Sequence, residues 1–185
     1  MTIPWLLSER LEYRELGDDD FAAVHAYASD PEVVRFMPWG PNTEPDTRDF
    51  LERAQRAALT EPRRGYEMAV VTRADGRLIG AVGLHLAEAD EQAMLGYCYH
   101  RDAWGLGYAT EAAETLLGFG FEVLLLRRIW AGCDPDNTAS ARVLEKVGMT
   151  LEGRLREDCN IRGVRRDTLM FGILDHEWTP RGETP

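Results

Sequence analysis

The sequence predicts an α+β domain built around one mixed sheet, and two observations carry that prediction. The chain has 185 residues, which is the size of one domain with a full hydrophobic core. Hydrophobic periodicity, interrupted by glycine and proline, gives the coarse order β-α-α-β-β-β-α-β-α-β-β. Because this order lacks regular βαβ alternation, it argues against the doubly wound sheet of dinucleotide-binding proteins.

The first half of the chain predicts an edge strand, two helices and two further strands. Alternating apolar residues from Leu11 to Leu16 indicate the edge strand. Helical spacing from Phe21, after three aspartates that favour a helix N-terminus, indicates the first helix. The segment PWGPNTEP breaks the pattern before a second helix, expected over residues 47–60. Two strands joined by a turn then follow over residues 66–87.

The second half predicts strands, two helices and a closing hairpin. A strand over residues 91–100 contains Gly96, and an interior glycine often marks a bulge or a close backbone approach. The remaining expected elements are a helix from about Tyr108 to Val123, a strand over 127–133, a short helix capped by Asp136 or Asn137 and stopped by Gly148, a hairpin over 153–174 with its loop near Arg162 and Gly163, and a fraying tail from 175.

Composition excludes several classes of function. The formal net charge of -11 argues against nucleic acid and would steer cationic partners, with plain solubility as an equal alternative. No apolar run approaches the roughly 18 residues of a membrane span, and the N-terminus lacks a signal-peptide pattern. Cys98, Cys133 and Cys159 are too widely spaced for a zinc or redox motif. We therefore expect a cytoplasmic protein without a metal or a membrane partner.

Gly105 and Gly107 stand where a strand meets a helix. A helix N-terminus presents unpaired amides and the positive end of the helix dipole, which together bind anions. Glycines also let the chain approach a ligand closely and adopt positive φ. The run WGLGYATEA has no Walker lysine, and Thr110 replaces the third glycine of a dinucleotide motif. A phosphate site and a plain turn are equal interpretations of this loop alone.

A second junction of the same kind makes the chain recognisable. The stretch DPDNTASARVLEKVGM also begins a helix at the end of a strand. Together with DPEVVRFMPWGP, IGAVGLH and LGYCYHRDAWGLGYATEA, it resembles the GNAT superfamily of acyl-CoA-dependent N-acyltransferases, and within it the RimJ/RimL-type branch. The resemblance runs from about residue 10 to residue 178. It implies a single GNAT domain over residues 1–185, with a splayed sheet of about six to seven strands and about four helices.

The resemblance implies that acetyl-CoA is the co-substrate. Its pantetheine arm would pair, as an added strand, with the open edge at Leu95, Tyr97 and Tyr99. Arg142 and Lys146 lie four residues apart and could meet the 3′-phosphate, with a solvated helix face as the equal alternative. Its pyrophosphate would rest on the backbone amides of Gly105, Leu106, Gly107, Tyr108 and Ala109.

Acetyl transfer needs a neutral amine, a polarised carbonyl and a stabilised leaving thiolate. By family position Asn137 contacts the arm near the thioester, and a strand amide near Tyr97 is the candidate to polarise the carbonyl. Ser140 is the candidate donor to the departing sulfur, with a bond to its own backbone as the alternative. Leu144 stands where many relatives have a tyrosine acid. Met94 replaces a glutamate that relatives commonly carry as a possible base.

The acceptor side is less sharply predicted. Trp39 is expected on the acceptor-side wall, with ordinary packing as an equal alternative. Glu157 and Asp158, expected to face the acceptor side, are alternative candidates for the base, and water alone is a further alternative. His85 and His100 are candidate bases, with ordinary packing or surface roles as the favoured alternative.

The predicted function is direct transfer of acetyl from acetyl-CoA to a primary amine in a ternary complex. The acceptor, expected to be cationic, is a protein N-terminus or a small molecule. The alternative is a non-catalytic acyl-CoA-binding or partner-regulating domain, which the residues at positions 94 and 144 motivate. A dinucleotide-dependent oxidoreductase is a weaker rival. A monomer and a homodimer are both compatible with the sequence.

Overall fold

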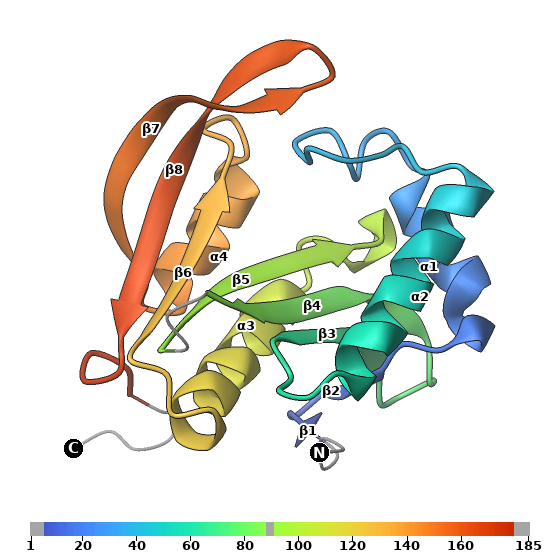
Figure 1. The fold of residues 1–185 in the computed structure, drawn as a ribbon, viewed down its shortest axis with the longest axis horizontal. Helices are drawn as coiled ribbons and strands as arrows, with labels where there is room; N and C mark the ends of the chain where they lie inside the picture. Colours follow the sequence, from blue (N-terminus) through green and yellow to red (C-terminus); the bar gives the residue numbers. More distant parts are fainter. Residues whose placement is uncertain (1–5, 88–90, 180–185) are drawn as a thin grey trace.

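The computed structural model describes residues 6–87 and 91–179. Within these ranges, eight strands form one sheet in the order β1-β2-β3-β4-β5-β6-β8-β7 (Figure 1). The strands are β1 (Leu6–Leu7), β2 (Leu11–Glu15), β3 (Gly65–Thr72), β4 (Leu78–Leu86), β5 (Gln92–Tyr99), β6 (Arg128–Cys133), β7 (Thr150–Ile161) and β8 (Val164–Leu174). The α-helices are α1 (Phe21–Ala28), α2 (Glu44–Leu59), α3 (Tyr108–Gly118) and α4 (Thr138–Lys146).

Both faces of the central strands are buried, which explains their nearly continuous apolar sequences. Met68 and Val70 of β3 belong to a core shared with α3 and α4. Ala69 and Val71, which alternate with them, belong to a second core under α1 and α2. The sheet therefore lies between two helical layers (Figure 1), and the predicted α+β class with a mixed sheet is confirmed.

Local signals set most of the element boundaries. The α2 helix begins at Glu44, earlier than predicted, because Thr43 and Asp46 form a capping box ahead of it. Of the two predicted caps of α4, Asp136 and Asn137, the structure uses Asn137, whose side chain accepts a hydrogen bond from the amide of Ser140. The helix predicted up to Val123 winds as an α-helix only to Gly118 and continues as a π-helical turn. The short β1 strand was not expected.

The sheet splays between β5 and β6. These two strands are parallel, yet they pair at only three positions, Gln92 with Arg128, Ala93 with Ile129 and Met94 with Trp130. Beyond Met94, β5 stays with β4 while β6 stays with β8, and Figure 1 shows the two halves diverging. One edge of residues 95–99 is consequently left without a neighbouring strand among the described residues. In the described ranges, no helix is both long enough and apolar enough to span a membrane.

Candidate active site

A cavity of about 940 Å³ lies where β5 and β6 separate. The open edge of β5 forms one wall, β6 and β8 form another, and the loop between α1 and α2 contributes residues 36–42 to the lining. Because β5 and β6 are parallel, the helices that follow them, α3 and α4, both begin at this end of the sheet. Residues on its wall include Trp39, Glu67, His85, Met94, Gly96, Tyr97, Cys133, Asn137, Ser140, Leu144 and Asp158.

Two glycines that pair across β4 and β5 leave one part of the cavity wall without side chains. Gly83 of β4 lies opposite Gly96 of β5 in regular register, so Gly96 does not mark a bulge. An added Cβ at Gly96 would meet no heavy atom within 4 Å. At Gly83 an added Cβ would lie 2.8 Å from Oε2 of Glu67. The missing side chains therefore leave space along β5 and let the Glu67 side chain lie across β4.

The glycine loop presents free amides at the start of α3. Gly105 has φ +73 and Gly107, the N-cap of α3, has φ +83, a conformation that favours glycine. No acceptor for the amides of residues 105–109 is found in the described part of the chain. The indole Nε1 of Trp104 donates to the carbonyl of Tyr99 over 3.0 Å and anchors the loop to β5. This geometry suits an anion.

Ser140 and Tyr97 bring two hydroxyl groups together across the separated strands. The phenol oxygen of Tyr97 lies 2.8 Å from Oγ of Ser140. Burial raises the pKa of Tyr97 above its ordinary value, so the phenol stays protonated at neutral pH. The sequence suggested Ser140 as a donor to the departing sulfur but took Tyr97 only for its backbone. A second hydroxyl, carried by β5, therefore stands beside Ser140.

Two cysteine thiols of the site, those of Cys98 and Cys133, are not activated. Cys133 lines the cavity beside Ser140. Burial and the charge of Asp134 raise the pKa of the Cys133 thiol to about 11. Burial also raises the pKa of Cys98 to about 12. Because only a thiolate is a strong nucleophile, these thiols do not favour a covalent cysteine mechanism.

Glu67 and His85 form a hydrogen-bonded pair on the cavity wall that the sequence analysis missed. Nε2 of His85 lies 3.1 Å from Oε2 of Glu67. The hydrogen bond to this carboxylate raises the pKa of His85 above its usual value, although burial acts in the opposite direction. His85 also pairs directly with Met94 across β4 and β5. A titratable pair therefore stands next to the position where the expected glutamate is absent.

The remaining predicted acceptor residues divide between the cavity and the surface. Trp39 lines the cavity and is 40% exposed. Glu157 does not line it, because a register shift between Leu155 and Cys159 interrupts the alternation of β7. Glu157 has φ +52, and its amide is bound by Asp167. Asp158 lines the cavity in its place, which corrects the predicted contact of Glu157.

The predicted coenzyme residues lie in two different environments. Leu95 and Tyr97 line the cavity, whereas the Tyr99 side chain is 6% exposed and belongs to the core under α3. The Tyr99 side chain is therefore not available to a ligand, and its backbone carbonyl already accepts the indole hydrogen bond of Trp104. Arg142 and Lys146 are exposed on α4 and lie outside the cavity lining. Their predicted contact with the 3′-phosphate stays a prediction.

Comparison with known proteins shows which family the chain resembles. Residues 10–150 match the acetyltransferase (GNAT) domain model. The chain is 31% identical over 175 residues to the uncharacterized N-acetyltransferase p20 of Bacillus licheniformis, covering 94% of this chain and 97% of that one. It is 28% identical over 176 residues to spermidine N(1)-acetyltransferase of Escherichia coli K12, covering 95% and 91%. A GNAT acetyltransferase structure from Bacillus anthracis has a TM-score of 0.84 at 32% identity, covering 94% and 100%.

The fold and these relatives define an acetyl-transferring enzyme. The chain belongs to the GNAT family of acetyltransferases. The predicted GNAT fold is confirmed, including the splayed sheet and the two helix N-termini beside the diverging strands. The narrower resemblance to the RimJ/RimL-type branch stays a prediction.

Proposed function

We propose that this protein transfers acetyl from acetyl-CoA directly to a primary amine while both substrates are bound. The observation that carries the proposal is one cavity holding a pair of hydroxyl donors, Tyr97 and Ser140, and a separate titratable pair, Glu67 and His85. The free amides of the glycine loop would bind the pyrophosphate, and the open edge of β5 would bind the pantetheine arm.

The residues of the cavity can supply both proton transfers that the reaction needs. Neutral His85, oriented by Glu67, accepts the proton that the amine loses as its nitrogen bonds to the thioester carbon. Ser140 hydrogen-bonds the sulfur as the carbon–sulfur bond breaks and donates its proton to the CoA thiolate. Tyr97 hydrogen-bonds the Ser140 oxygen and stays protonated, and the proton that His85 took from the amine returns to Ser140 through solvent after the products leave. These groups favour catalysis over the alternative of a domain that only binds acyl-CoA.

A small cationic amine is the proposed acceptor. The carboxylates of Asp46, Asp49, Glu67 and Asp158 line the cavity, together with the guanidinium of Arg53. This acidic lining would attract an ammonium group on a second end of the acceptor. The relative from Escherichia coli is named for acetylation of spermidine, a small amine. A protein N-terminus is the second candidate, because the resemblance to the RimJ/RimL-type branch favours it.

The test is acetyl-CoA-dependent release of CoA thiol across a panel of acceptors. The panel holds polyamines, monoamines, amino-acid amides and peptides with free N-termini. We expect turnover with at least one cationic amine, and mass spectrometry should show the product heavier by one acetyl group. Binding of acetyl-CoA without turnover on any acceptor would favour the non-catalytic alternative. Failure to bind CoA would overturn the proposal.

A further inference from the structure

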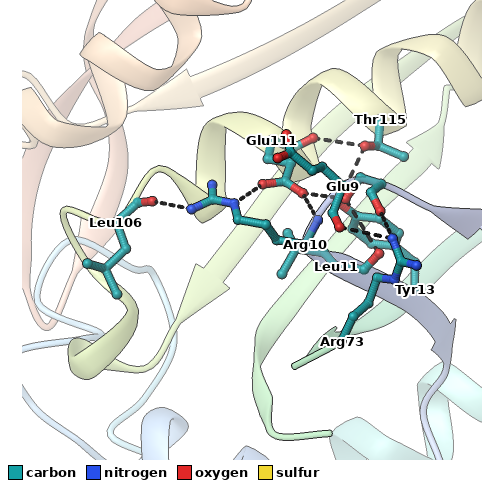
Figure 2. Close-up of polar contacts among 9 residues, drawn as sticks. Glu9, Arg10, Leu11, Tyr13, Arg73, Leu106, Glu111 and Thr115 are labelled. Atoms are coloured by element: carbon teal, nitrogen blue, oxygen red, sulfur yellow. Dashed lines mark hydrogen bonds and ion pairs between the residues drawn. The ribbon is translucent and has the colours of Figure 1, made fainter. Parts of the chain in front are cut away.

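Arg10, just before β2, reaches the glycine loop almost a hundred residues further along the chain. Its Nη1 donates to the carbonyl oxygen of Leu106 over 2.9 Å, and its guanidinium lies 4.5 Å from the ring centroid of Tyr108. Its Nε donates to Oε2 of Glu111 over 2.7 Å. Figure 2 shows Arg10 between Leu106 of the loop and Glu111 of α3. One side chain thus connects the N-terminal segment to the glycine loop and to the first turn of α3.

Glu111 is held firmly enough to orient Arg10. Its Oε1 accepts hydrogen bonds from Oγ of Ser8 and from the backbone amide of Arg10, each over 2.7 Å. Burial opposes ionisation of this carboxyl, but the hydrogen bonds from Ser8 and Arg10 outweigh it and lower the pKa of Glu111. Glu111 is therefore ionised at neutral pH, and its two oxygens fix both the backbone and the guanidinium of Arg10.

The hydrogen bond to Leu106 has a consequence on the opposite side of the loop. The carbonyl of Leu106 and the amide of Gly107 belong to one planar trans peptide, so they point in opposite directions. Holding the carbonyl against Arg10 turns the Gly107 amide away from Arg10. An added Cβ at Gly107 would lie 3.4 Å from Nη2 of Arg10, which places the guanidinium against this glycine. A loop with two positive-φ glycines has few internal restraints, so an outside contact is needed to select one orientation.

The position of Arg10 is otherwise electrostatically unfavourable. A cation near the N-terminus of a helix opposes the helix dipole. Glu111, in the first turn of α3, offsets this charge. The Arg10 side chain is still 43% exposed, but its guanidinium is committed to Glu111 and to the carbonyl of Leu106, on the side of the loop away from the Gly107 amide.

We propose that Arg10 is a positioning residue for the coenzyme, which orients the peptide between Leu106 and Gly107 so that the loop amides are arranged for the pyrophosphate. This inference rests on the acetyl-CoA site proposed above. Loss of a hydrogen bond from a charged group to a preorganised loop is expected to weaken CoA binding about 10-fold. Binding of a ligand without a pyrophosphate should not change.

The test compares Arg10→Gln and Arg10→Lys with a matched control, Arg73→Gln. Arg73 donates to the backbone carbonyls of Ser8 and Glu9, so it contacts the same N-terminal segment without contacting the loop (Figure 2). Calorimetry would measure the Kd of CoA and of S-acetylpantetheine, which lacks the nucleotide and the pyrophosphate. The Tm of each variant would be recorded alongside.

We expect Arg10→Gln to raise the Kd of CoA about 10-fold and to leave the Kd of S-acetylpantetheine unchanged. Arg73→Gln should leave the Kd of both ligands unchanged. Arg10→Lys should bind CoA nearly as weakly as Arg10→Gln, because an ammonium group lacks the fork that joins Glu111 to Leu106. Full affinity in Arg10→Lys, or equal weakening of both ligands, would overturn the positioning role. If Arg10→Gln lowers the Tm too far for titration, Glu111→Gln gives the same test.

The outcomes separate this inference from the proposed function. If the unmodified protein binds CoA and Arg10→Gln binds it equally well, only the role of Arg10 is wrong. If the unmodified protein binds no CoA, the coenzyme site itself is wrong and the inference fails with it.

Discussion

The phenol of Tyr97 and the hydroxyl of Ser140 lie 2.8 Å apart, although they belong to β5 and α4. Asn137, whose side chain accepts from the Ser140 amide, fixes the first turn of α4 in this position. The pair stands where β5 and β6 have separated, beside the open edge of β5. It is therefore placed to meet a thioester bound along that edge.

Ser140→Ala should lower kcat much more than it weakens coenzyme binding. The proposed role is on the departing sulfur, so we expect kcat to fall about 100-fold while the Kd of CoA changes less than about 2-fold. Steady-state kinetics and calorimetry would measure the two quantities. Tyr97→Phe should show a smaller fall, because Ser140 would remain beside the sulfur. Equal kcat in Ser140→Ala and the unmodified protein would remove Ser140 from the mechanism.

The pH dependence of kcat/KM should report on His85. Its pKa is raised above the ordinary value of 6.5 by Glu67, so the imidazole is protonated below that raised pKa and becomes a base above it. The rate should therefore rise with pH through an inflection above 6.5. Glu67→Gln removes the carboxylate that raises the pKa, and the inflection should move to lower pH.

A control separates this inflection from deprotonation of the acceptor. The pKa of the free amine is the same for every variant. Only the inflection in kcat/KM that comes from His85 should therefore shift along the pH axis. His85→Gln should lose the inflection and lower kcat/KM about 100-fold. An unchanged pH profile in Glu67→Gln would show that this pair is not the base.

Gly96 should be replaceable without loss of stability but not without loss of activity. An added Cβ there meets no heavy atom within 4 Å, so Gly96→Val should change the free energy of unfolding by only about 0.5 kcal/mol. The side chain would enter the substrate cavity, and kcat/KM should fall about 100-fold. Denaturant unfolding and steady-state kinetics would measure the two effects.

Gly80→Ala, one strand away, is the contrasting variant. An added Cβ at Gly80 would overlap the carbonyl oxygen of Cys98 on β5. It should destabilise the fold by about 2 kcal/mol, because a backbone group cannot easily move aside. Full activity in a well-folded Gly96→Val protein would mean that substrates do not occupy the space along β5.

Local chemistry made part of this site predictable. The glycines at 105 and 107 and the cap at Asn137 each shape a helix start that lies within a few residues in the sequence. The Glu67–His85 pair depends instead on the register of β3 and β4, which sets Glu67 opposite Gly83 and His85 opposite Gly65. No local pattern gives that register. A carboxylate and a histidine at alternating positions of two neighbouring apolar strands would have been the available signal.

The same reasoning explains the error at Glu157. Strand alternation predicts which side chains share a face only while the ladder is regular. The shift between Leu155 and Cys159 breaks the ladder, and the bulge moves Asp158 to the cavity. Contacts that join distant segments, such as those of Arg10 and Arg162, are likewise invisible to periodicity.

Arg162 should control acceptor binding, because it joins two segments that both contribute residues to the cavity lining. From the turn between β7 and β8, its Nη2 donates to the carbonyl of Val34 over 2.8 Å, and its Nη1 to that of Arg35 over 3.3 Å. These carbonyls belong to the loop that carries Trp39. We expect Arg162→Gln to raise the KM of the amine about 10-fold, with little change in the KM of acetyl-CoA.

Arg165 provides the matched control on the same hairpin. It is an exposed arginine of β8 that lies outside the cavity lining, so Arg165→Gln changes the net charge equally. If the effect of Arg162 comes from its contacts with the loop, Arg165→Gln should leave both KM values unchanged. Equal increases in the KM of the amine for both variants would assign the effect to charge alone. An increase in the KM of acetyl-CoA for Arg162→Gln would show that the hairpin supports the coenzyme side of the cavity.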